Sequence, residues 1–142
     1  MPYKCLTFIH RKPTTTPTAF RTAWETHMQL LMALTHPHQP LESVRHYPAR
    51  TDSAIAQRAP VSARPADANA PLVLLGDADL VTWDCLSECT YRDELHFQQF
   101  YAMLSEKGVG ERIAASEERA SDMGRLKVVV VGETVVDRFE GR

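Results

Sequence analysis

The chain has 142 residues, enough for one domain with its own hydrophobic core, and we expect a single domain over residues 1–142. Its 16 basic and 18 acidic residues give a net charge of −2, which provides no reason to expect nucleic acid or an acidic membrane surface as a partner. No apolar run approaches the roughly 20 residues that cross a bilayer, and no secretory signal is evident at the N-terminus.

Three elements are predicted in the first third of the chain. Residues 3–10 are typical of a strand. Residues 17–35 are predicted to form a helix, because Thr16 is a good N-cap and Pro17 suits the first helical position. A proline-containing break follows, and a second strand is predicted over residues 41–50.

Residues 51–71 are predicted to be a long loop rich in alanine and proline, with a short helical piece at residues 53–58. A loop of this length inside a compact domain is usually functional or disordered. A lid over a site and a plain linker are therefore both open interpretations.

The second half of the chain repeats the alternation of strands and helices. A strand is predicted over residues 81–91, and helices over residues 93–106 and 111–122. The strongest strand prediction is residues 126–136, because four consecutive valines occupy positions 128–131.

This β-α-β-β-α-β order predicts an α+β, ferredoxin-like domain whose helices cover one face of the sheet. The valine run is apolar on both faces, so we expect both faces of the sheet to be buried. A homodimer with sheets packed face to face would bury the second face. The alternative cover is the loop over residues 51–71.

The cysteines are expected to be free. All three, Cys5, Cys85 and Cys89, fall in predicted strands. Cys85 and Cys89 would stand about 13 Å apart along an extended chain, too far for a disulfide or a shared zinc ion. Reduced cysteines and the missing signal favour a cytoplasmic protein.

His27 is the residue that first suggests chemistry. At about 100° per residue it falls within roughly 20–60° of Phe20, Trp24 and Leu31 on the apolar face of the first helix. The pattern alone favours a core histidine satisfied by the backbone. The alternative is a buried imidazole that moves protons near neutral pH. No nucleotide-binding, serine-hydrolase or zinc-protease motif occurs.

Four segments together resemble the EthD-like family of dimeric α+β-barrel proteins, in particular its fungal polyketide-tailoring branch. The first strand is followed by Arg11-Lys12-Pro13 and a helix entered through Thr-Pro. That helix carries Phe20-Arg21 and then Trp24-Glu25-Thr26-His27. The third strand opens with Asp84 and carries Glu88, and Glu117-Glu118 lies in an acidic helix before the closing strand. The resemblance covers most of the chain except residues 51–75.

The resemblance implies a homodimeric enzyme that uses no cofactor and no metal. Family members tailor aromatic polyketides by decarboxylation, by dehydration that aromatises a ring, or by oxygenation of anthrones. The site would lie between the sheet and the helices, and the helix histidine that points into it would be His27.

On this basis each candidate residue has an expected role. His27 would be the general acid and base, Asp84 would orient its ring, and His46 could be a second proton donor. Tyr47 could hydrogen-bond a phenol or ketone, and Arg45 or Arg50 could hold a substrate carboxylate. An aromatic wall is expected from four residues: Phe8, Trp24, Trp83 and Phe100.

The leading hypothesis is a cofactor-independent lyase, a decarboxylase or dehydratase, acting on an aromatic polyketide-derived carboxylic acid. A cofactor-free anthrone-type oxygenase is the alternative enzyme. A non-catalytic dimeric protein that binds a small molecule in the same pocket is the alternative from another class.

Overall fold

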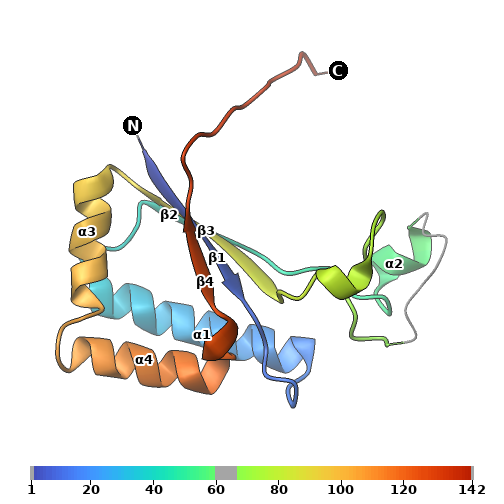
Figure 1. Cartoon of the computed structure of the whole chain (residues 1–142), viewed down its shortest axis with the longest axis horizontal. Coiled ribbons are helices and arrows are strands. Elements are labelled where there is room, and N and C mark those ends of the chain that lie inside the picture. The colour runs from blue at the N-terminus through green and yellow to red at the C-terminus, as the bar shows by residue number, and fades with distance from the viewer. Residues whose placement is uncertain (1, 60–66, 142) are drawn as a thin grey trace.

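The computed structural model describes residues 2–59 and 67–141 as a four-stranded antiparallel sheet with helices on one face (Figure 1). The strand order is β2-β3-β1-β4, the arrangement of a ferredoxin-like α+β domain. The predicted fold class is therefore confirmed. The elements along the chain are β1 (Tyr3–Ile9), α1 (Pro17–Thr35), β2 (Glu42–His46), α2 (Ala54–Arg58), β3 (Cys85–Tyr91), α3 (Glu94–Met103), α4 (Val109–Ala120) and β4 (Lys127–Val130).

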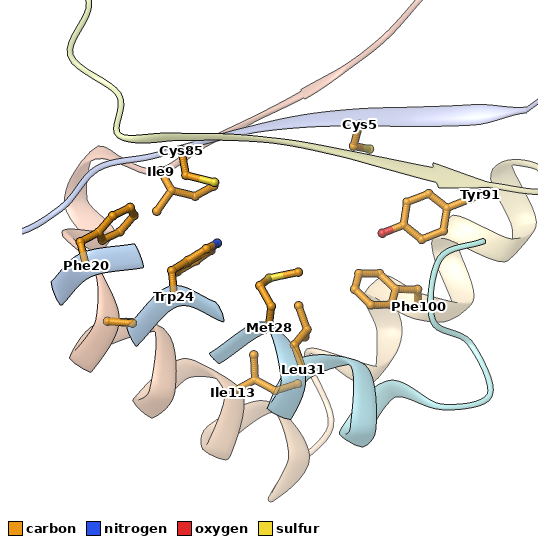
Figure 2. Close-up of a cluster of buried hydrophobic side chains, with 11 residues drawn as sticks. Cys5, Ile9, Phe20, Trp24, Met28, Leu31, Cys85, Tyr91, Phe100 and Ile113 are labelled. Atoms are coloured by element: carbon orange, nitrogen blue, oxygen red, sulfur yellow. The ribbon is translucent and has the colours of Figure 1, made fainter. Parts of the chain in front are cut away.

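The register of the two central strands decides which side chains face the helices. Cys5 on β1 lies opposite Cys89 on β3, and Ile9 lies opposite Cys85. Side chains alternate along a strand, so these positions share one face of the sheet. All but Cys89 are buried, and Figure 2 shows Cys5, Ile9 and Cys85 directed at α1.

Helix α1 begins and ends where the sequence predicts. The Thr16 hydroxyl accepts a 3.1 Å hydrogen bond from the Ala19 backbone N–H, and Pro17 stands at the start of the helix. The predicted apolar stripe is the buried face of this helix, with Phe20, Trp24, His27, Met28, Leu31 and Thr35 inaccessible to solvent. No helix in the described ranges is long and apolar enough to cross a membrane.

An ionic clamp on the other side of α1 ties this helix to the segment at β2. Arg45 donates to Glu25 from Nε at 2.6 Å and from Nη2 at 2.9 Å. The Tyr47 hydroxyl donates to the same carboxylate at 2.6 Å. The hydrogen bond from Arg45 holds the pKa of Glu25 below its usual value, and that from Tyr47 acts in the same direction.

The loop between β2 and β3 forms a lobe beyond one end of the sheet rather than a cover over its outer face (Figure 1). The predicted helical piece at 53–58 is confirmed as α2, and the Ser53 hydroxyl caps it by accepting from the Ala56 N–H. Residues 60–66 of the predicted loop lie outside the described residues. The sequence left open whether this loop covers the outer face of the sheet. The described part of the loop does not cover it.

Three predicted strands are longer than the observed ones, because a strand extends only as far as its partner. The second, predicted over residues 41–50, ends at His46, opposite Leu86 near the start of β3. The third strand begins at Cys85 rather than residue 81, because its partner β1 ends at Ile9. The fourth ends at Val130 rather than residue 136. Val131 still donates to the Lys4 carbonyl, but β1 begins at Tyr3 and offers later residues no partner. Residues 131–141 leave the body of the molecule as an extended arm (Figure 1).

The burial predicted for both faces of the valine run is not found within one chain. Val128, Val129 and Val130 are 48%, 47% and 51% exposed. β4 is an edge strand that pairs with β1 alone, and the outer face of the sheet carries no helix. Among the described residues, no further element packs over the outer face of this strand.

We expect Glu25→Gln to lower the free energy of unfolding at pH 7 by up to about 1 kcal/mol, because the clamp is partly exposed to solvent. The folded-state pKa of Glu25 is lowered, so its contribution is present above the unfolded value of 4.5 and disappears as pH falls through the folded value. Urea unfolding at pH 7 and at pH 3 measures both effects. The exposed Glu42→Gln is the control, and a Glu25→Gln deficit of equal size at both pH values would contradict the account.

Candidate active site

A cavity of about 310 Å³ lies between the inner face of the sheet and the helices. This volume is at the lower end of the range for small-molecule sites. Its walls are mostly apolar and aromatic, and they come from every strand except β2 and from three helices. The lining includes Cys5, Thr7, Ile9, Trp24, His27, Met28, Leu31, Ser87, Cys89, Tyr91, Phe97, Phe100, Tyr101, Glu117, Met123 and Val128.

His27 is the histidine that lines this cavity. The residue is only 1% exposed, and its Nδ1 lies 2.8 Å from the Ser116 hydroxyl. Its Nε2 lies 3.6 Å from Oε1 of Glu117, within ion-pair range but too long for a hydrogen bond. One ring nitrogen is thus held by Ser116, while the other is free to bond a third atom placed beside Glu117.

The packing of α1 against α4 creates this arrangement (Figure 1). Ile113, Ser116 and Ala120 are the buried residues of α4, at the three- and four-residue spacing of one helix face. Glu117 borders that face and is partly buried, whereas Glu118 points to solvent. The helix geometry therefore admits one carboxylate of the Glu117-Glu118 pair to the cavity and excludes the other.

Histidine and glutamate in this relation can exchange protons with a bound molecule. The Ser116 contact fixes the orientation of the ring, and the Glu117 carboxylate lies beside the ring nitrogen that has no hydrogen-bond partner among the described residues. Within the described residues, His27 is the one basic group at ion-pair distance from Glu117. The pair is thus a general acid/base candidate in an apolar setting, where an uncompensated charge is costly.

Asp84 does not orient His27, so that prediction is wrong. Its Oδ1 lies 3.0 Å from Nη2 of Arg50 and 3.3 Å from Nε of Arg11, and its Oδ2 accepts from the Arg11 backbone N–H at 2.9 Å. These contacts fasten the loop after β2 to the end of β1. Arg50 is committed to Asp84 and Arg45 to Glu25, so neither faces the cavity as a carboxylate anchor.

His46 lies on the opposite face of the sheet from the cavity, and its prediction as a second proton donor is wrong. It is exposed, with Nε2 2.8 Å from Oε2 of Glu88. Lys4 lies 3.9 Å from Oε1 of the same carboxylate. Glu88 is thus an ion-pair partner on the outer face, as its place in the strand alternation requires.

The predicted aromatic wall is half correct. Trp24 and Phe100 line the cavity. Phe8 falls on the outer face of the sheet because it alternates with Thr7 and Ile9, which face inward. Tyr47 lies beside Glu25, and Trp83 lies ahead of β3, so neither reaches the cavity lining.

The sequence does not identify three site residues: Glu117 and Tyr91, which line the cavity, and Ser116, which contacts His27. The sequence places Glu117 in an acidic helix, but periodicity along the chain does not say which element packs beside His27. Tyr91 closes the alternation Cys85, Ser87, Cys89, so the pattern did contain a signal for its inward orientation. In residues 2–59 and 67–141 no three His, Cys, Asp or Glu side chains gather as metal ligands would.

Comparison with known families gives one match, to the EthD domain, over residues 12–124. No curated protein matches the sequence. Among solved structures, the chain is similar to a hypothetical Arabidopsis thaliana protein, with 12% identity, a TM-score of 0.48 and coverage of 96% of this chain and 92% of the other. It is also similar to a dimeric ferredoxin-like protein of unknown function from Thermobifida fusca YX, with 11% identity, a TM-score of 0.49 and coverage of 92% and 90%.

We expect Asp84→Asn to lower the free energy of unfolding by about 1–3 kcal/mol, because Arg11 and Arg50 lose their shared counter-charge in a largely buried site. Urea unfolding measures the change, with the exposed Asp79→Asn as the matched control. A variant of unchanged stability would show that the cluster does not fasten the loop.

Proposed function

Because the chain belongs to the EthD domain family, we propose that it is a cofactor-independent lyase that removes carbon dioxide or water from an aromatic, polyketide-derived acid. The observation that carries the proposal is the His27–Glu117 pair, buried at the edge of a largely apolar cavity. One histidine with one free ring nitrogen suits reactions that need a single proton moved at a carbon next to a carbonyl.

In the decarboxylation, the bond between the substrate carbon and its carboxylate breaks and the electron pair stays on the substrate as an enolate. The Nε2–H of protonated His27 delivers its proton to that carbon, and carbon dioxide leaves. Neutral His27 then regains a proton from solvent. The Glu117 carboxylate lies 3.6 Å from Nε2 and is the counter-ion for the ring when it carries the proton that it donates.

In the dehydration, neutral His27 takes the proton next to the carbonyl at Nε2. The same proton then goes to the leaving hydroxyl, so that water departs and the ring becomes aromatic. Glu117 stabilises the imidazolium between the two transfers. Both reactions use the same nitrogen, so the substrate decides which bond breaks.

We also propose that the working unit is a homodimer. Half-exposed apolar side chains on the outer face of the sheet support this, and they lie beside the small Lys4–Glu88–His46 ion-pair group. The apolar side chains of that face are Leu6, Phe8, Val44, Leu86 and Val129. A second copy would bury them by packing its own sheet against this one.

His27→Ala should lower turnover by about 10²- to 10⁴-fold, and Glu117→Gln should lower it in the same direction by a smaller factor. Glu118→Gln is the matched control, since it makes the same substitution one residue away on the exposed side of α4. The measurement is turnover by the purified, metal-free protein of three kinds of acid: hydroxyaryl or β-keto acids that can lose carbon dioxide, β-hydroxy ketone acids whose ring can lose water and become aromatic, and anthrone acids that can gain oxygen. Mass spectrometry follows each acid with and without oxygen. Unchanged turnover in His27→Ala would exclude the mechanism.

The mass change identifies the reaction. Loss of one carbon dioxide or one water without oxygen supports a decarboxylase or a dehydratase, respectively. Gain of oxygen only in air assigns an oxygenase instead. Binding with no chemical change in any acid of the panel contradicts the lyase and leaves the small-molecule-binding protein.

Val129→Lys should convert the protein to monomers, because it places a charge on the apolar outer face of β4. Sedimentation equilibrium measures the mass in solution. Leu75→Lys is the control, since Leu75 is 94% exposed and lies on the loop lobe. A wild-type protein that sediments as a monomer would refute the dimer.

A further inference from the structure

Two hydrogen-bond donors in the cavity have no partner among the described residues. The Trp24 indole Nε1 is buried and unpaired, in a residue only 3% exposed. Tyr91 is 2% exposed, and its hydroxyl makes no hydrogen bond to any residue that the structure describes. Buried donors are nearly always satisfied in folded proteins, so the fully buried Trp24 N–H calls for an explanation. The Tyr91 hydroxyl is a second donor, on a residue that lines the same cavity.

The two donors face the same space from opposite walls. Trp24 projects from α1 and Tyr91 from the end of β3, and both line the cavity. Figure 2 shows the indole nitrogen and the phenol oxygen directed toward the open space between sheet and helix, with Tyr91 at the end beyond Leu31. The stretch of α1 from Trp24 to Leu31 is roughly 10 Å long.

The two ends of the cavity differ in chemistry. The Trp24 ring lies 4.7 Å from the His27 ring between centroids, so its N–H belongs to the end where His27 acts. Tyr91 lies among Phe97 and Phe100, with ring centroids 5.2 and 5.4 Å away. Burial raises the pKa of Tyr91, so at neutral pH the phenol is protonated and able to donate.

We propose that Trp24 and Tyr91 are specificity-determining residues, which select a flat aromatic ligand carrying an oxygen acceptor at each end. The Trp24 N–H binds the oxygen beside the reacting carbon, and the Tyr91 hydroxyl binds the oxygen at the far end. The aromatic and aliphatic walls between them accept a linear polycyclic skeleton. This inference rests on the proposed use of the cavity as the substrate site, and it adds which oxygens of the substrate are recognised.

The test uses three probes of one skeleton: 2,6-dihydroxyanthraquinone, 2-hydroxyanthraquinone and anthraquinone. Calorimetric titration of the full chain should give an affinity for the dihydroxy probe roughly five- to tenfold above that for the monohydroxy probe. This ratio is the gain in affinity expected from one additional hydrogen bond. In Tyr91→Phe this ratio should fall to about one. Tyr3→Phe is the matched control, because Tyr3 lies directly opposite Tyr91 in the sheet but is not part of the cavity lining.

Tyr91→Phe removes one oxygen without a hydrogen-bond partner and leaves the packing of the ring intact, so the variant should fold, which thermal denaturation verifies. Trp24→Phe examines the other end. It should reduce the advantage of the monohydroxy probe over anthraquinone. Because a smaller ring also disturbs the core, the Tyr91 variant decides the outcome if the Trp24 variant does not fold.

Two results would overturn the inference. One is a Tyr91→Phe variant that loses affinity equally for all three probes, which would indicate a packing role. The other is wild-type protein that binds none of the probes or does not distinguish them. The probes carry no carboxyl group, so selective binding without turnover of any acid refutes the lyase alone, and turnover of an acid without selective binding refutes the recognition alone.

Discussion

Burial of one face of α1 is the interaction on which the rest of the structure depends. The stripe from Phe20 to Leu31 packs at once against the inner face of the sheet and against α4. Trp24 and His27 belong to this same stripe, so the residues that hold the helix in place also line the cavity. The site is therefore a cavity within the hydrophobic core. Residues of α3 and Tyr91 line its far end.

The carboxylates of this protein differ in the groups that pair with them, and this difference distinguishes the site. Asp84 is shared by two arginines, Glu25 is bound by Arg45 and Tyr47, and Glu88 meets Lys4 and His46. Glu117 has His27 as its basic neighbour. Glu117 differs from these carboxylates because it lines the cavity, where its basic neighbour is a buried imidazole.

The two faces of the sheet differ in whether helices cover them. Helices cover the inner face, whereas none of the helices that the structure describes covers the apolar side chains and the Lys4–Glu88–His46 group of the outer face. The edge strand β4 and the arm over residues 131–141 add further exposed valines. Unpaired edges and uncovered apolar faces are the features by which sheets associate, which is the physical basis for proposing a dimer.

The sequence by itself determined the order of elements, the bounds of α1 and the place of His27 on its buried face. These follow from caps and from periodicity, which are local and are written along a single segment. It also indicated the short helical piece at residues 53–58, which is α2. What the sequence could not decide was the identity of partners across the fold. Asp84 and Glu117 are both acidic residues on elements near His27 in the predicted topology. Only the packing of α4 beside α1 places Glu117 next to the ring, while Arg11 and Arg50 hold Asp84 elsewhere.

The lengths of β3 and β4 were also decided by the tertiary structure. A strand extends only as far as β1 offers hydrogen bonds to it, and that limit lies in another part of the chain.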